Sequence, residues 1–209
     1  MIKRITLFVL IVLSANSCKN DQAQNSTDTK NTEVTVHEMD ELRLTLPSNY
    51  EYINAIQDLQ RFFDENGGKI AQTDPGLFDV IAKDIGMNKQ FYFDASGGAN
   101  FNYVYVDLVG PRFPLQDPLV NNYVGMFEKQ FIIRFASRQY KLEKLDLKRM
   151  TVLQNEIVNV KHKHTLDGLV WYTDHYYIQM KGNRRSLILV SYDYNGGGLD
   201  LKDYLTTVY

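Results

Sequence analysis

Hydrophobic and polar positions divide this 209-residue chain into three parts. Residues 5–13 are a continuous apolar run, and residues 19–36 contain almost no large apolar side chain. Regular apolar spacings begin near Glu38 and continue to the end of the chain. The apolar run is too short to span a bilayer, and the polar stretch cannot bury enough surface to offset the entropy of ordering. The pattern predicts a leader over residues 1–17, a flexible tether over 18–37 and one globular domain over 38–209.

Within the globular part, apolar residues at helical spacing predict three helices. The first covers residues 53–63 and ends at Asn66-Gly67-Gly68, and the second covers residues 77–85 after Asp74-Pro75. The third, over 120–135, has the strongest pattern, and its polar residues Glu128 and Arg134 are assigned to the solvent face. Its apolar face is formed by Val120, Tyr123, Val124, Phe127, Phe131 and Phe135.

The remaining pattern is mostly that of strands with short turns. Asp167-Gly168 and Lys181-Gly182-Asn183 have the composition of tight hairpin turns, and a short helix is expected over 199–208. The expected strands cover residues 42–46, 91–93, 101–108, 142–153, 156–164, 169–180 and 185–193. This order predicts an α+β fold with a mainly antiparallel sheet.

Composition narrows the possible functions. The chain has 23 Lys and Arg against 25 Asp and Glu, so it lacks the positive charge that nucleic-acid binding needs. Its single cysteine excludes an internal disulfide and any site built from several cysteines. Neither a GxGxxG nor a GxxxxGK[ST] motif occurs, and there is no GxSxG motif. We therefore expect no cofactor, no nucleic-acid partner and no serine-hydrolase chemistry.

The N-terminal segment MIKRITLFVLIVLSANSC carries a positive start, an apolar run and then Ala15-Asn16-Ser17 before Cys18. This segment resembles the signal peptide and lipobox of bacterial lipoproteins, in the loose form found in Bacteroidetes. The resemblance implies cleavage before Cys18, acyl chains such as palmitate on that residue, and anchoring in the cell envelope, at the outer membrane. Whether the periplasmic or the outer surface carries the protein stays open, and a plain secretory signal is the alternative.

The domain resembles the PsbP/DcrB-like family in its order of elements from Gln90 to Tyr209. The opening segment RLTLPSNYEYI, with Pro47 and Tyr50, and the late segment YYIQMKGNRRSLILVSYDY carry the same resemblance. It implies an α/β/α sandwich that acts as a binding or assembly module rather than as an enzyme. A cystatin-like or other α+β sandwich is the competing fold.

Three histidines form a candidate metal site. His162 and His164 stand two apart on an expected strand, so their side chains share one face. His175 lies on the next expected strand, and two imidazoles with a third ligand across the strands would suit zinc.

The hairpin register argues against this metal site. Counting from the Asp167-Gly168 turn places Thr173 near Lys163, and His175 beyond the immediate reach of His164. The segment KHKH at 161–164 is also typical of a solvated strand face, which is the favoured interpretation.

Aromatic residues on the same expected hairpin are candidates for partner binding. Tyr172 and Tyr176 share one face of the strand, and Trp171 and Tyr177 share the other. One face has to pack on the helices, whereas the other could meet a ligand or a partner. Core packing is the favoured interpretation for these side chains.

Together these features predict a lipid-anchored envelope protein that binds an envelope protein or a ligand without catalysing a reaction. Its contact with the membrane is through Cys18. The first alternative is a metal-assisted envelope hydrolase that uses His162, His164 and His175. The second is a carrier of apolar ligands, with a pocket between the sheet and the helix at residues 123–135.

Overall fold

The structure is a computed structural model that describes residues 33–39, 42–85, 87, 89–96, 100–111, 115–180, 185–196, 199–202 and 204. The expected leader, the site at Cys18 and most of the expected tether lie outside these residues. No helix in the described ranges is both long and apolar enough to cross a membrane.

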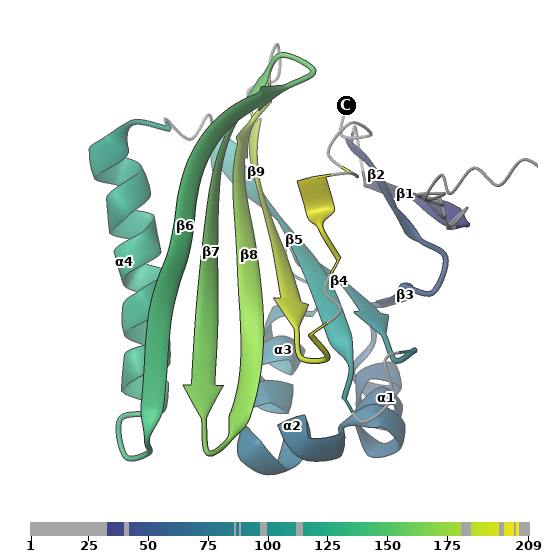
Figure 1. The fold of residues 1–209 in the computed structure, drawn as a ribbon. Helices are drawn as coiled ribbons and strands as arrows, with labels where there is room; N and C mark the ends of the chain where they lie inside the picture. Colours follow the sequence, from purple (N-terminus) through teal and green to yellow (C-terminus); the bar gives the residue numbers. More distant parts are fainter. Residues whose placement is uncertain are drawn as a thin grey trace, which may run out of the picture. The chain divides into compact units, whose positions relative to one another are not determined.

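The described part contains a two-stranded and a seven-stranded antiparallel sheet (Figure 1). The small sheet pairs β1 (Val34–Met39) with β2 (Leu42–Pro47). The large sheet has the strand order β3-β4-β5-β9-β8-β7-β6. Its strands are β3 (Glu51–Ile53), β4 (Lys89–Asp94), β5 (Asn102–Pro111), β6 (Tyr140–Val152), β7 (Asn155–Leu166), β8 (Leu169–Gln179) and β9 (Arg185–Asp193). The predicted α+β class with a mainly antiparallel sheet is confirmed.

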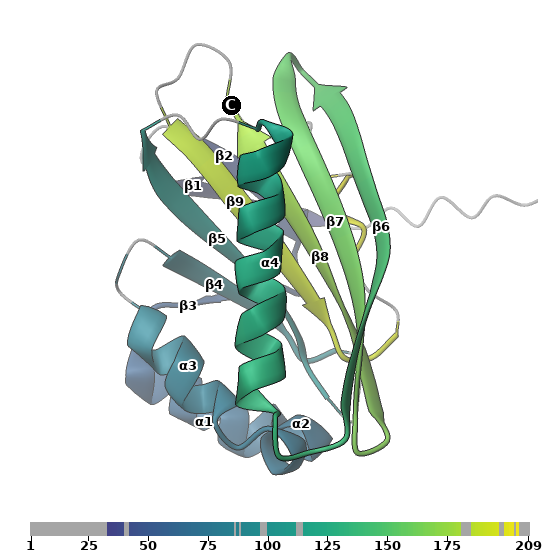
Figure 2. The ribbon, with the colours of Figure 1, turned by 90° about the vertical axis from the view of Figure 1, so that its left-hand side faces the viewer.

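All the described α-helices lie on one face of the large sheet (Figure 2). They are α1 (Ile56–Asn66), α2 (Gly68–Thr73), α3 (Leu77–Asp84) and α4 (Asp117–Arg134). On the other face, Leu44 and Leu46 of the β1–β2 hairpin pack with Tyr92, Tyr176 and other buried residues. Within the described residues, this second layer is therefore a hairpin, where the expected α/β/α sandwich would have helices. Of the helix expected over 199–208, the described residues form a 3₁₀ turn at 201–202.

Strand β1 begins at Val34, inside the segment that the sequence assigned to the tether. That assignment was based on the lack of side chains to bury, and Val34 and Val36 are indeed 49% and 55% exposed. The strand is held instead by its main-chain pairing with β2, from Val34 opposite Pro47 to Met39 opposite Leu42. A prediction from side-chain burial alone therefore starts the folded domain too late in the sequence.

Three predicted helices are confirmed as α1, α3 and α4, with shifted ends. Helix α2 and strand β3 were not predicted. Ile53, which the helical pattern included, lies in β3. Glu128 and Arg134 of α4 were assigned to the solvent face, but both are partly buried and bind other parts of the domain.

The β7–β8 turn is the tight turn that the sequence predicted. Asp167 and Gly168 both have positive φ angles, of 48° and 83°, as a type I′ hairpin turn requires. Since an L-residue is strained at the glycine position, Gly168→Ala is expected to lower the free energy of unfolding by about 1 kcal/mol. Gly125→Ala is the matched control, because it adds a methyl group to an open site within α4. It should raise stability by up to about 1 kcal/mol in urea denaturation, and a loss of stability there would contradict the assignment.

Candidate functional site

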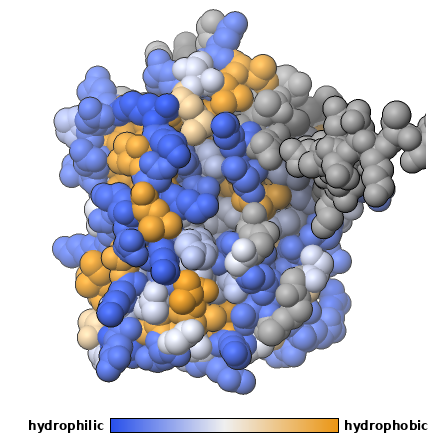
Figure 3. Space-filling view, viewed as in Figure 1, coloured by the Kyte–Doolittle hydropathy of each residue, from blue (hydrophilic) through white to orange (hydrophobic). Residues whose placement is uncertain are grey.

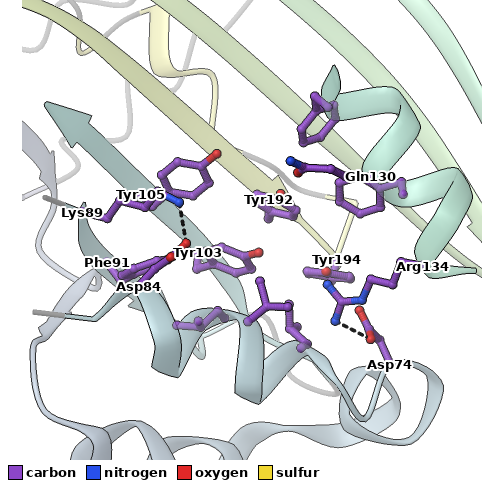
Figure 4. Close-up of a pocket in the computed structure, with 15 residues that line it drawn as sticks. Asp74, Asp84, Lys89, Phe91, Tyr103, Tyr105, Gln130, Arg134, Tyr192 and Tyr194 are labelled. Carbon is purple, nitrogen blue, oxygen red and sulfur yellow. Dashed lines mark hydrogen bonds and ion pairs between the residues drawn. The ribbon is translucent and has the colours of Figure 1, made fainter. Parts of the chain in front are cut away.

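A cavity of about 200 Å³ lies between the large sheet and two helices, α3 and α4. Its floor is formed by tyrosines from the middle of the sheet, and its sides are formed by side chains such as Leu77 and Ile81 of α3 and Phe127 and Phe131 of α4. We call this cavity the tyrosine pocket (Figure 4). Helix α3 forms a third wall that the sequence did not predict.

Strand alternation explains why four tyrosines meet on this floor. Tyr103 and Tyr105 stand two apart on β5, and Tyr192 and Tyr194 stand two apart at the end of β9. Side chains two apart share a face, and Tyr103 lies directly opposite Tyr192 in the antiparallel register. Their rings stack with centroids 4.3 Å apart and planes 10° apart. The floor is therefore a row of aromatic rings that contact one another and are fixed by two neighbouring strands.

Two ion pairs lie at opposite ends of the pocket (Figure 4). At one end the Arg134 guanidinium of α4 donates to the Asp74 carboxylate at 2.6 Å. Burial raises the pKa of Asp74, and the nearby guanidinium opposes that rise. At the other end Lys89 of β4 pairs with Asp84 of α3. The four charged side chains of the lining are thus two acids and two bases, already paired.

Two tyrosine hydroxyls of the floor are left without a partner. Within the described part of the chain, neither Tyr105 nor Tyr194 forms a hydrogen bond through its hydroxyl group. Burial raises the pKa of both phenols well above the ordinary value, so they stay protonated and can donate. Gln130 of α4 also lines the pocket with its amide group. A polar group on a bound molecule could therefore satisfy several uncommitted donors and acceptors.

The candidate metal site is not formed among the described residues, in which no group of three His, Cys, Asp or Glu side chains could hold a metal ion. His164 uses both ring nitrogens, one with the Tyr140 hydroxyl at 2.7 Å and one with Thr173 Oγ1 at 2.9 Å. His162 donates Nε2–H to Glu128 at 3.0 Å. The Phe127 ring packs edge-on against His175, with centroids 3.9 Å apart, and the His175 ring lies 5.9 Å from the His162 ring.

The favoured interpretation of the KHKH segment, a solvated face, is wrong for its histidines. His162, His164 and His175 are all at most 2% exposed and lie beneath α4, whereas Lys161 and Lys163 belong to the opposite face. The register differs from the expected one by one residue, because Thr173 lies opposite His162. Burial lowers the pKa of all three histidines, and that of His164 falls to about 3. We call these three residues the histidine face.

The aromatic candidates for partner binding are mostly core residues. Trp171, Tyr176 and Tyr177 are at most 4% exposed, so they cannot form a recognition surface. The favoured interpretation, core packing, is confirmed for these three, and only Tyr172 is partly exposed. On the described part of the face drawn in Figure 3, hydrophobic residues form separate patches among hydrophilic ones. A continuous apolar surface, which often marks a protein interface, is not seen on that part.

The residues that form the floor of the tyrosine pocket were not predicted from the sequence. Tyr103 and Tyr105, and likewise Tyr192 and Tyr194, are pairs two apart on expected strands, which was a usable signal. The pairing of β5 with β9 could not be predicted, because these strands are 74 or more residues apart in the sequence. The Arg134–Asp74 pair, 60 residues apart, gave no signal of its own.

Neither the family models nor the curated proteins that were searched contain a match to this chain. Among solved structures, PA94 of Pseudomonas aeruginosa, a protein of unknown function, matches with a TM-score of 0.36 and 11% identity over 81% of this chain and 87% of its own. The Ran-binding protein Mog1p of Saccharomyces cerevisiae matches with a TM-score of 0.43 and 10% identity over 78% of each chain. Both TM-scores are below 0.5, and nothing about the function of this chain is drawn from them.

Proposed function

We propose that this protein is a non-enzymatic binding module that holds a small molecule in the tyrosine pocket. The observation that carries the proposal is the pair of unpartnered hydroxyls, of Tyr105 and Tyr194, in a cavity walled by aromatic rings. Ligand sites are commonly apolar concave surfaces with a few polar groups that fix orientation. Hydroxyls that line a pocket can bond water when it is empty, and a ligand with a hydrogen-bond acceptor can take the place of that water.

The alternative of a metal-assisted hydrolase has less support. His164 uses both ring nitrogens in hydrogen bonds, and His162 uses Nε2 with Glu128. Among the described histidines of the set, this leaves His162 Nδ1 and His175 Nε2 without a partner, which is two ring nitrogens and not three. Catalytic zinc needs three protein ligands around one point and an open position for water. The histidine face instead supports the sheet beneath α4.

The proposal places this binding module at the cell envelope, through acylation of Cys18. The support is the lipobox-like segment, and the resemblance to PsbP/DcrB-like domains agrees with a binding or assembly role. Acyl chains contribute about 0.8 kcal/mol per buried CH₂ group, enough for stable anchoring when more than one chain is attached. The ligand would therefore be an envelope or extracellular molecule.

Cys18→Ser is expected to release the protein from the membrane fraction, because the thioether link cannot form. Sedimentation of cell envelopes, with detection of the protein in the pellet and the supernatant, measures this release. The acylated Cys18 peptide should also be found by mass spectrometry of the unaltered protein. If the Cys18→Ser protein sediments with membranes as fully as the unaltered one, the anchor is wrong.

Filling the tyrosine pocket should weaken ligand binding at least about tenfold. Gln130 is an exposed residue of α4 that lines the pocket, so Gln130→Phe fills the cavity without removing a core side chain. Binding can be followed by the fluorescence of Trp171, the single tryptophan, which stacks on Tyr194 with centroids 5.6 Å apart. A screen of small molecules should give compounds that bind the unaltered chain and lose at least about tenfold in affinity with Gln130→Phe.

The matched control for this experiment is Ile132→Phe. Ile132 lies on the same helix, is 54% exposed and does not line the pocket. Compounds that bind the unaltered chain should bind Ile132→Phe equally well. If the screen gives no compound that Gln130→Phe excludes, the proposed function is wrong.

A further inference from the structure

The size of the tyrosine pocket limits the ligand to a small molecule. Its volume is about 200 Å³, and a cavity of roughly 150 Å³ in a protein core is large enough for benzene. The pocket therefore accommodates a single six-membered ring with one or two substituents. Fused ring systems and long acyl chains would require α3 or α4 to move.

The walls of the pocket favour an aromatic ring over a saturated one. Tyr103 and Tyr192 stack on each other in the floor, Tyr105 has its centroid 6.2 Å from Tyr192, and Phe127 and Phe131 close the opposite side. Aromatic rings attract one another in stacked and edge-to-face arrangements at centroid distances of about 4.5–7 Å. A flat ring between the tyrosine floor and Phe127 and Phe131 can gain such contacts on two sides, which a puckered aliphatic ring cannot.

The charges of the pocket favour an uncharged ligand. Arg134 is already paired with Asp74, and Lys89 with Asp84, so the lining has no net charge and no unpaired ion. A charged ligand would lose its hydration here and gain a partner only by breaking one of these pairs. The free groups of the lining are instead neutral hydroxyls, on Tyr105 and Tyr194, which suit a neutral acceptor such as a carbonyl or an amide.

From these three observations, and on the basis of the proposed function, we infer that the tyrosine pocket binds an uncharged molecule with one aromatic ring and a hydrogen-bonding substituent. The ring lies against the tyrosine floor. Its substituent accepts a hydrogen bond from the hydroxyl of Tyr105 or of Tyr194, which lie on either side of Tyr192.

Three compounds of similar size separate the parts of this inference. Benzamide has the ring and a neutral amide, cyclohexanecarboxamide keeps the amide on a saturated ring, and benzoate keeps the aromatic ring but is charged. Isothermal titration of the full chain at neutral pH should give a benzamide affinity about fivefold higher than that of cyclohexanecarboxamide. It should also be at least about tenfold higher than that of benzoate.

Removal of single hydroxyls tests the predicted contacts. Tyr105→Phe or Tyr194→Phe should weaken benzamide binding about fivefold, since the variant that removes the contacted hydroxyl keeps the ring and loses one donor. Tyr52→Phe is the matched control, because Tyr52 lies on β3, is 45% exposed and does not line the pocket. Its affinity for benzamide should be unchanged.

The outcomes distinguish the inference from the function that underlies it. Equal or reversed ranking of the three compounds, or no effect of Tyr105→Phe and Tyr194→Phe, overturns the ligand class. If benzamide does not bind while other compounds bind and are excluded by Gln130→Phe, the ligand class is wrong and the pocket remains a binding site. If Gln130→Phe excludes no compound at all, both the function and the inference fail.

Discussion

Acidification from pH 7 to pH 5 is expected to lower the free energy of unfolding of this domain by up to about 4 kcal/mol, because its buried histidines resist protonation. An unfolded histidine has a pKa near 6.5, whereas burial lowers that of His164 to about 3 and that of His175 well below the ordinary value. Below pH 6.5 the unfolded chain therefore binds protons that the folded chain does not. At pH 5 His164 contributes about 2 kcal/mol to the loss, at about 1.4 kcal/mol per pH unit, and His175 adds a loss of the same sign and of at most that size.

The direction of this effect follows from the direction of the pKa shifts. Above pH 6.5 the imidazoles are neutral in both the folded and the unfolded chain, so they do not change the free energy of unfolding. Below pH 6.5 the free energy of unfolding falls as the pH is lowered toward 3. Asp74 and Asp174 act in the opposite sense, since burial raises their pKa and favours proton uptake by the folded state. Urea denaturation at several pH values between 7.5 and 4.5 measures the net change in the free energy of unfolding, which combines the loss from the histidines with the gain from the aspartates.

His175→Leu is the variant that isolates one histidine. The Nε2 atom of His175 is buried and has no hydrogen-bond partner among the described residues, so an apolar side chain of similar size should raise stability at pH 7 by about 1 kcal/mol. It should also reduce the pH slope of stability by up to about 1.4 kcal/mol per unit below pH 6.5. An unchanged slope would mean that His175 is accessible to protons in the folded domain.

Loss of the Arg134 guanidinium should destabilise the domain by about 3 kcal/mol at pH 7. Arg134→Met leaves the Asp74 carboxylate, which is only 8% exposed, without its partner, and removal of one member of a buried ion pair typically costs this much. The double variant Arg134→Met/Asp74→Leu should regain most of the loss, because no charge is then left unpaired. Urea denaturation of Arg134→Met, Asp74→Leu and the double variant, together with the unaltered chain, completes a double-mutant cycle.

The control for this pair is the exposed ion pair of α1. Arg61 and Asp58 are 2.9 Å apart, with 68% and 45% of their side-chain surfaces exposed. Arg61→Met should therefore change stability by less than about 1 kcal/mol. If Arg134→Met is no more destabilising than Arg61→Met, the Arg134–Asp74 pair does not help to close the pocket.

The local elements of this fold could be read from the sequence, but their pairing could not. Helical periodicity depends on neighbours in sequence, so the apolar spacing correctly predicted that Val120, Val124 and Phe131 are on the buried side of α4. Tyr123 was predicted on the same side, and this was wrong, because it is 39% exposed. The same spacing could not show that Glu128 and Arg134 would find partners in β7 and at the α2–α3 junction. Those contacts depend on where the helix lies on the sheet.

The candidate site was missed for the same physical reason. Alternation correctly placed Tyr172 with Tyr176, and Trp171 with Tyr177, on opposite faces of β8. It could not show that both faces of this strand are covered, one by α4 and the other by the β1–β2 hairpin. The tyrosine pocket needs β5 beside β9, and this order is set by the long-range topology of the sheet.

The most direct measurement is an NMR determination of where a bound aromatic molecule lies. With benzamide added to the full chain, we predict nuclear Overhauser contacts from its ring protons to the rings of Tyr105 and Tyr194, and their loss in Gln130→Phe. Contacts to the exposed surface alone, or contacts that persist in Gln130→Phe, would contradict the account.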